Sequence, residues 1–180
     1  MDEQLNPWKV VRKETAYENN WIRVEHHDVI NPAGNPGIYG KVHFRNVAIG
    51  IVPVDDEGNT WLVGQYRFTL DQYSWEIPEG GSPEGTLPLD SAKRELLEET
   101  GLVAQEWTEL LKMYLSNSVT DEVAYIYLAR GLQQLEPEPE ETEQLEIRKL
   151  PLAEAYKMVD EGRITDAMSV AALLKVKTIV

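Results

Sequence analysis

The sequence predicts an α+β fold, because strand-like and helix-like segments are unevenly distributed along the chain. Segments in which apolar and polar residues alternate, as is typical of strands, make up most of the chain and are joined by short turns. One helical segment interrupts them, and two further helical segments come last. A regular strand–helix alternation, which would indicate a doubly wound parallel sheet, is not found. We therefore expect a layered α+β domain built from mostly antiparallel strands.

The individual elements follow from turn residues and helix signals. Strands are expected over residues 21–30, 40–44, 46–54, 60–66, 74–77, 109–114, 123–129 and 145–149. Residues 31–37 are rich in turn formers, and residues 55–59 are expected to close a hairpin. Residues 136–143 carry five acids and two prolines, which predicts a loop. Helices are expected over residues 88–100, 152–161 and 166–177; Pro151 opens the second and Gly162 ends it.

Composition narrows the classes of function. The formal net charge of −14 argues against a nucleic-acid-binding face or an anionic membrane partner, since both need clustered Lys and Arg. The chain has no cysteine, which excludes disulfides, thiolate zinc sites and a cysteine nucleophile. No apolar run approaches membrane-spanning length, and the first residues do not resemble a secretory leader. We expect a cytoplasmic protein.

Three carboxylates are concentrated on the helix expected over residues 88–100. Glu95, Glu98 and Glu99 share one stripe, because residues three and four apart are neighbours on a helix. Their repulsion can be relieved by protonation, by neighbouring Lys or Arg, or by a divalent cation, and Mg²⁺ prefers carboxylate oxygens. A solvated acidic helix face is the alternative. The stripe predicts a hard-metal site.

The segment from Gly80 to Leu102 resembles the Nudix box. In this pattern a Gly is followed by five residues, a Glu, seven residues and then Arg-Glu-hydrophobic-x-Glu-Glu-x-Gly-hydrophobic. The matching residues are Gly80, Arg94, Glu95, Leu96, Glu98, Glu99, Gly101 and Leu102. The first Glu of the pattern falls on Thr86, although Glu84 lies two residues earlier. Thr86 is well suited to cap the N-terminus of the following helix instead.

The resemblance implies a fold and a metal-dependent activity. The Nudix fold is a mixed β-sheet sandwiched between helices, and here it would occupy residues 45–180. Residues 1–44 are similar to the N-terminal β extension of the ADP-ribose and nucleotide-sugar pyrophosphatase branch, which contributes to dimerisation and substrate recognition. We therefore expect a homodimer. The cofactor implied is Mg²⁺, with Mn²⁺ as an alternative.

The resemblance also implies roles for single residues. Glu95 and Glu99 would be the first metal ligands, Glu98 would be a second-choice ligand and part of the catalytic set, and the backbone carbonyl of Glu79 would join them. Arg94 would orient the glutamates by an ion pair. In related enzymes the catalytic base lies on a late acidic loop, where Glu141 matches the base and Glu143 an accessory acid. A solvated acidic loop is the alternative.

Substrate contacts are implied at three further positions. Arg67 follows a strand and would bind the diphosphate, for which a guanidinium is well shaped. Glu122 would accept a sugar hydroxyl, and Trp21 would stack on the base, with Trp8 as a second aromatic candidate. The proline usual in the loop of ADP-ribose pyrophosphatases is absent from residues 115–117. The three histidines, His26, His27 and His43, receive no role.

The resemblance implies Mg²⁺-dependent hydrolysis of a nucleoside diphosphate linked to a sugar, such as ADP-ribose or a nucleotide sugar. The products would be a nucleoside monophosphate and a sugar phosphate, and the partner would be this small-molecule nucleotide. Because Thr86 replaces a glutamate of the box, a nucleotide-binding regulatory module without catalysis is an alternative. An acidic interaction domain without a ligand is a further one.

Overall fold

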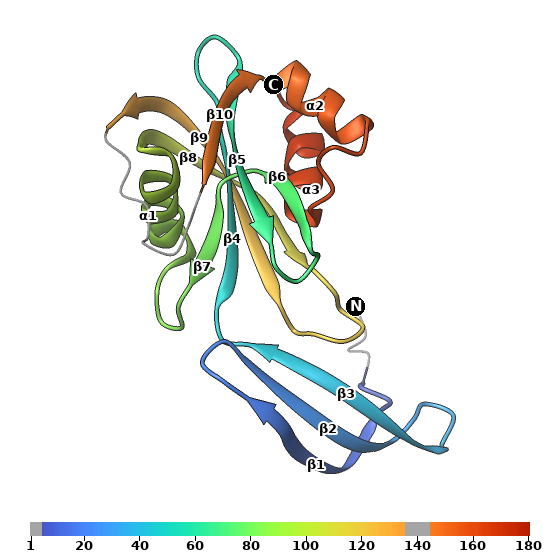
Figure 1. Ribbon diagram of the computed structural model, residues 1–180. Helices are drawn as coiled ribbons and strands as arrows, with labels where there is room; N and C mark the ends of the chain where they lie inside the picture. Colours follow the sequence, from blue (N-terminus) through green and yellow to red (C-terminus); the bar gives the residue numbers. More distant parts are fainter. Residues whose placement is uncertain (1–4, 136–144) are drawn as a thin grey trace. The chain divides into compact units, whose positions relative to one another are not determined.

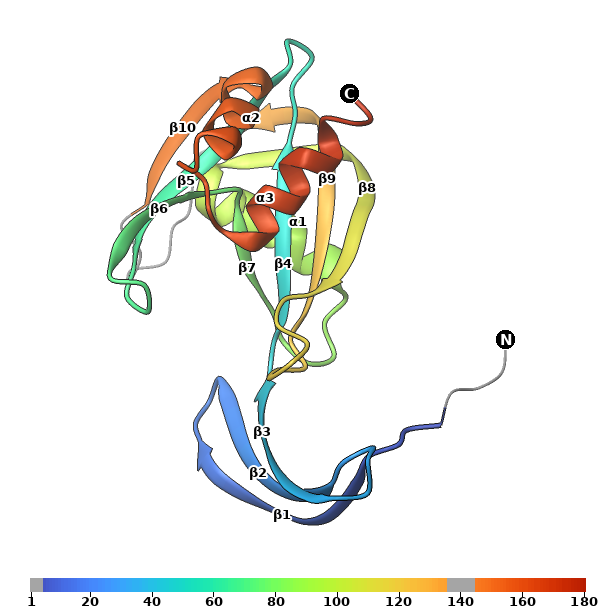
Figure 2. The same cartoon turned by 90° about the vertical axis from the view of Figure 1, so that its right-hand side faces the viewer.

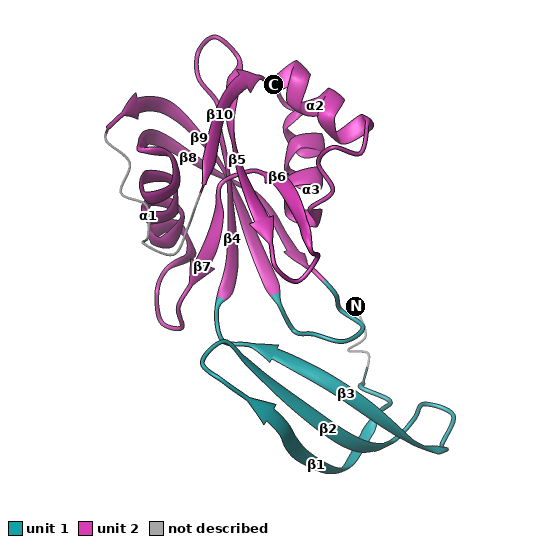
Figure 3. Cartoon of the chain, viewed as in Figure 1, with its two compact units in different colours: residues 1–46, 116–122 teal, residues 47–115, 123–180 magenta. Residues whose placement is uncertain are grey.

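The computed structural model describes residues 5–135 and 145–180 as two compact units (Figures 1 and 3). One unit contains the residues up to Asn46 together with Ser116–Glu122, and the other contains Val47–Leu115 and Val123–Val180. Within the described ranges, no helix is both long and apolar enough to cross a lipid bilayer.

The first unit is a three-stranded antiparallel sheet. Its strands β1 (Lys9–Glu18), β2 (Ile22–Ile30) and β3 (Pro36–Phe44) follow one another in the order β1-β2-β3. The sheet is strongly curved (Figure 2), and β1 carries two irregularities in its pairing with β2. Every residue of β1 is exposed. Residues 1–44 were expected to form a β extension, but no strand with its own bounds was predicted at β1, because its polar and apolar residues do not form a buried face.

The second unit contains two sheets. The four-stranded sheet has the order β7-β4-β9-β8, and the three-stranded sheet has the order β10-β5-β6. Their strands are β4 (Val47–Pro53), β5 (Asn59–Arg67), β6 (Gln72–Glu76), β7 (Glu79–Ser82), β8 (Leu102–Tyr114), β9 (Val123–Gln134) and β10 (Glu146–Pro151). Strands β4 and β9 run parallel, and the other pairs are antiparallel, so the four-stranded sheet is mixed.

Helices cover the mixed sheet from both sides. Helix α1 (Pro88–Thr100) packs against β7 and β4, while α3 (Ala167–Val176), with α2 (Leu152–Asp160) beside it, also packs against β4. In Figure 2, α3 lies in front of β4 and α1 lies behind it. The expected α+β fold, a mixed sheet sandwiched between helices, is confirmed.

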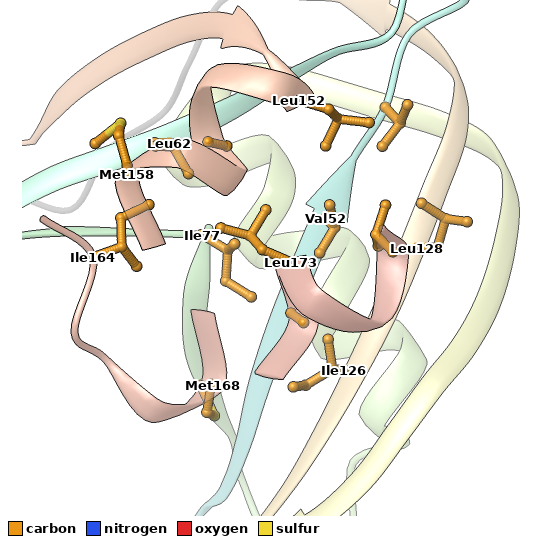
Figure 4. Packing of buried hydrophobic residues seen from close by; sticks show 14 of the residues in the cluster. Val52, Leu62, Ile77, Ile126, Leu128, Leu152, Met158, Ile164, Met168 and Leu173 are labelled. Carbon is orange, nitrogen blue, oxygen red and sulfur yellow. The ribbon is translucent and has the colours of Figure 1, made fainter. Parts of the chain in front are cut away.

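Two apolar clusters fill the space between the sheet and its helices. The larger lies under α2 and α3 (Figure 4) and includes Val52, Leu62, Ile77, Ile126, Leu128, Leu152, Met158, Ile164, Met168 and Leu173. The smaller lies under α1 and includes Ile49, Ile51, Trp61, Ala92, Leu96, Leu102, Tyr127 and Ala129. Burial of apolar area at roughly 25 cal/mol per Å² makes these clusters the main source of stability.

Several strands differ from their expected bounds. Strand β8 begins at Leu102 instead of residue 109, and β9 continues to Gln134 instead of residue 129. Most of the extra residues of β8 pair with the extra residues of β9. This pairing makes them strands, although their sequence does not alternate between polar and apolar residues. Strand β7 was not among the predicted strands; its residues pair with β4 despite two glycines.

Candidate active site

The candidate site is built where β7 meets helix α1. Helix α1 begins with Pro88 in its first turn and ends at Gly101, whose φ of 70° is the left-handed conformation that favours glycine. The expected cap by Thr86 is wrong: Leu87 is the N-cap residue, and no side chain caps the helix. Thr86 and Glu84 are both exposed. The face of α1 that packs on β7 carries Glu95 and Glu99 among its buried residues.

Glu95 is held by a backbone amide and by an arginine. Its Oε1 accepts hydrogen bonds from the N–H of Gly81, at 3.1 Å, and from Nη2 of Arg94, at 2.6 Å. Only 12% of the side chain is exposed. Burial, the largest effect, raises the pKa of Glu95 above its ordinary value, and Arg94 opposes this rise. The carboxylate occupies the space that a Cβ would fill at Gly80, so this position of the box requires glycine.

Glu99 lies one helical turn further along the same face. Its Oε2 accepts a hydrogen bond from the N–H of Glu79, with an N–O distance of 2.9 Å. The residue is 4% exposed. Two buried carboxylates of α1 thus accept hydrogen bonds from β7 backbone N–H groups two residues apart, those of Glu79 and Gly81. The helix and the strand fix both positions.

Arg94, which is exposed, and Glu98, which is half-buried, lie at the border of this arrangement. Nη1 of Arg94 donates to Glu98 Oε2 at 2.5 Å, and Nη2 also donates to the backbone carbonyl of Gly81 at 3.0 Å. One guanidinium therefore contacts Glu95, Glu98 and the β7 backbone together. The orienting role of Arg94 stays a prediction.

The side chain of Glu79 points away from α1, toward helix α3. Its Oε1 accepts a hydrogen bond from Ser169 Oγ at 2.9 Å, and Ser169 Oγ in turn accepts one from the N–H of Ile77 at 3.0 Å. Burial raises the pKa of Glu79 well above its ordinary value, and the charges of Asp166 and Glu76 raise it further. The side chain thus has its own contacts, whereas the sequence assigned a role only to the carbonyl.

The donor chemistry of the site fits a divalent cation. Within the residues that the structure describes, no three acidic or histidine side chains converge into a complete ligand set. Mg²⁺ does not require one, because proteins usually hold it by one or two carboxylates, with waters and substrate phosphates completing the octahedron. Glu95 and Glu99 provide two such carboxylates on a buried surface.

Arg67 is already engaged by another residue. Its Nε lies 3.0 Å from both carboxylate oxygens of Glu76, and its Nη2 donates to Glu76 Oε2 at 2.5 Å. Glu76 is 3% exposed, so the guanidinium neutralises a buried charge. Arg67 Nη2 also lies 3.9 Å from Glu79 Oε2. The side chain of Arg67 remains 37% exposed, which leaves part of it accessible to an anion.

The other two predicted substrate contacts belong to the first unit. Trp21 follows β1 and is 68% exposed. Glu122 is half-buried, and burial raises its pKa. A concave pocket of about 370 Å³ in this unit is lined by Asn6, Trp8, Val10, His27, Val29, Tyr39 and Lys41, with the Trp8 and Tyr39 rings edge to face. Trp21 is not among these lining residues. The predicted base and accessory acid, Glu141 and Glu143, lie outside the described residues.

Sequence reasoning missed a cluster around Glu25. His27 and His43, to which no role was given, both contact this buried carboxylate. The signal in the sequence was the spacing: Glu25 and His27 are two residues apart and therefore share one face of a strand. Nothing in the sequence alone predicted that β3 would add His43 to the same face.

Comparisons with known proteins show which family the chain resembles. The NUDIX domain family matches residues 44–172, and the nucleoside diphosphate sugar hydrolase N-terminal domain matches residues 8–42. An ADP-ribose pyrophosphatase of Bacillus subtilis is 32% identical over 92% of this chain and 90% of its own length. An ADP-ribose pyrophosphatase of Mycobacterium tuberculosis is 36% identical over 73% of this chain and 65% of its own length.

A solved structure described as an ADP compounds hydrolase superimposes with a TM-score of 0.87 and 25% sequence identity, covering 98% of this chain and 95% of that one. The fold, the two carboxylates of α1 seated on β7 and the family match over residues 44–172 lead to one conclusion: the chain belongs to the NUDIX domain family of hydrolases.

Proposed function

We propose that the protein hydrolyses the diphosphate linkage of a nucleoside diphosphate attached to a sugar, with ADP-ribose as the first candidate. The products are a nucleoside monophosphate and a sugar phosphate. The observation that carries this proposal is the seating of Glu95 and Glu99 on the N–H groups of β7. The names of the similar proteins, ADP-ribose pyrophosphatase and ADP compounds hydrolase, support the substrate class.

Nudix hydrolases use divalent cations, and we propose Mg²⁺, replaceable by Mn²⁺, for this chain. Glu95 and Glu99 would hold it, with Glu98 and the backbone carbonyl of Glu79 as further ligands. When bound, the cation neutralises charge on the phosphoryl oxygens and makes water more acidic. The buried position of the two carboxylates supports this assignment, since desolvated like charges gain most from a cation.

The residues of the chain divide the remaining work. Arg94 fixes the carboxylates of Glu95 and Glu98 by the contacts described above. The exposed part of Arg67 binds the diphosphate. Glu141, with Glu143 as an accessory acid, accepts a proton from the attacking water while the bond from phosphorus to the bridging oxygen breaks.

We further propose that Glu122 contacts the sugar and Trp21 the base. Residues 1–44 then act as a recognition and dimerisation extension of a hydrolase domain at residues 45–180. Exposed apolar side chains on the N-terminal sheet, including Val10, Val11, Tyr17 and Ile38, support the homodimer, because a three-stranded sheet needs apolar cover. The cytoplasmic location rests on composition alone.

A panel assay tests the function. ADP-ribose, GDP-mannose, UDP-glucose, NADH and diadenosine polyphosphates are incubated with the protein in Mg²⁺, in Mn²⁺ and in EDTA, and released phosphomonoester is measured. We expect one strongly preferred substrate and no release in EDTA. No release from any compound in either metal would overturn the proposal. Light scattering on the same sample measures the mass, and a monomer would contradict the proposed dimer.

A further inference from the structure

The ring of His43, on β3, lies between two carboxylates of the first unit. Nδ1 is 2.6 Å from Asp121 Oδ2, and Nε2 is 3.0 Å from Glu25 Oε2. A neutral imidazole has one N–H donor and one acceptor nitrogen, so it can donate to only one of two ionised carboxylates. Both hydrogen bonds form when the ring carries two N–H groups. The geometry therefore fits an imidazolium.

Glu25 is ionised, so it has no proton to donate to the His43 ring. It is 8% exposed on its side chain, and the hydrogen bond from His43 is the largest of the effects that lower its pKa to about 2. Burial opposes this shift, while His27 Nε2, at 3.0 Å, and Lys13 on β1 support it. Arg23 also faces this carboxylate, with Nε 3.3 Å from Oε1. Cations on β1, β2 and β3 thus keep Glu25 ionised.

Asp121 is ionised as well. Burial raises its pKa, but the hydrogen bonds from Lys41 and His43 outweigh burial and lower it. Lys41 Nζ lies 3.2 Å from Asp121 Oδ2, the same oxygen that His43 contacts. Six titratable or charged groups surround the His43 ring, directly or through these two carboxylates: Glu25, Asp121, Lys41, His27, Lys13 and Arg23.

The contact with Asp121 belongs to a strap of chain, residues 116–122, that lies along β3. The N–H of Val42 donates to the carbonyl of Val119 at 2.8 Å, and the N–H of Asp121 donates to the carbonyl of Val42 at 3.2 Å. Tyr39 Oη donates to the carbonyl of Ser118 at 2.6 Å. The salt bridge of Asp121 to His43 and Lys41 adds charged hydrogen bonds to these backbone contacts.

We propose that His43 is a positioning residue: through its bonds to Glu25 and Asp121 it fixes the strap 116–122 against β3 and so places Glu122, the last residue of the strap. The role of Glu122 in sugar binding rests on the proposed function; the fixing of the strap does not.

Amide hydrogen exchange of the whole chain, measured by NMR without substrate, tests the fixing. The reporters are the amides of Val42 and Asp121, and the amide of Ile51 in the other unit, bonded to the carbonyl of Pro78 at 2.9 Å, is the reference. In His43→Gln, which can donate at only one end, we expect the protection factors of both reporters to fall roughly ten- to a hundredfold, with Ile51 unchanged.

His26→Gln is the matched control. His26 is a neighbouring histidine that contacts Asp28 and not Glu25 or Asp121, so the same substitution there should leave both reporters protected. Unchanged protection in His43→Gln would overturn the proposal. If His43→Gln does not fold, Asp121→Asn takes its place, and the same loss of protection is expected because the strap loses its charged partner.

A kinetic experiment, with the substrate found in the panel assay, tests the placing of Glu122. His43→Gln should raise KM several-fold with little change in kcat, a result that mere destabilisation would not give. A loosened strap with an unchanged KM would overturn the link to Glu122. If the panel assay finds no substrate, the proposed function fails while the exchange data still decide the fixing of the strap.

Discussion

The carboxylate of Glu99 accepts a hydrogen bond from the backbone N–H of Glu79, across a separation of 20 residues in the chain. This bond ties the last turn of α1 to the first residue of β7. Every residue except proline carries a backbone N–H, so most substitutions at Glu79 leave this hydrogen bond in place. Glu95 has a similar bond from the N–H of Gly81, in addition to its contact with Arg94.

Replacing Glu99 by glutamine removes the negative charge of the side chain but keeps an oxygen that can accept the hydrogen bond. The amide oxygen of glutamine can accept the same N–H bond, so the free energy of unfolding should change by less than about 1 kcal/mol. The loss of the negative charge should lower kcat about a thousandfold or more, with a modest change in KM. Steady-state kinetics at saturating Mg²⁺ measure this, and the exposed Glu106→Gln is the control. Near-normal kcat in Glu99→Gln would show that this carboxylate is not a ligand.

Gly80→Ala tests the close packing of α1 on β7. The new Cβ would occupy the position of the Glu95 carboxylate, so either the helix or the side chain has to move. We expect a loss of about 1–3 kcal/mol in the free energy of unfolding and a weaker affinity for Mn²⁺. Urea unfolding and calorimetric titration with Mn²⁺ measure the two effects. Gly40→Ala adds a methyl group where nothing lies within 4 Å and serves as the control.

Arg67 should affect both stability and substrate binding. Arg67→Ala leaves the carboxylate of Glu76 buried without its cation, which should destabilise the fold by about 3 kcal/mol and, if Arg67 binds the diphosphate, also raise KM. The double variant with Glu76→Gln removes the buried charge and should restore most of the stability while KM stays high. If KM recovers together with stability, Arg67 does not bind the diphosphate and serves only to neutralise Glu76.

How far the sequence predicted this structure can be traced to particular elements. The helix at residues 88–100 was predicted with its observed bounds, because Pro88 and Gly101 mark its ends and its buried face is periodic. Strand β7 could not be predicted in the same way. Its pairing with β4 depends on partners from distant parts of the chain, which a local pattern does not contain.

The candidate site shows the same division. The grouping of Glu95, Glu98 and Glu99 follows from helical spacing and was visible in the sequence. That Glu79 turns its side chain toward Ser169 could not be predicted, because it depends on where α3 packs. The wrong assignment of a cap to Thr86 has a related cause: the box loop bonds through its backbone, with the Thr86 N–H donating to the carbonyl of Pro83.

Glu25 makes the stability of the protein dependent on pH in the acid range. Its pKa is about 2 in the folded protein, lowered first by the hydrogen bond from His43, against 4.5 for a free glutamate. The folded state therefore binds the proton less tightly than the unfolded state, so the stabilisation is complete above about pH 4.5 and is lost as the pH falls toward 2. Urea unfolding of the wild type and Glu25→Gln at pH 6, 4 and 3 measures this contribution. The difference in unfolding free energy between the two proteins should shrink as the pH falls. A difference that stays constant would show that the negative charge of Glu25 does not stabilise the folded protein.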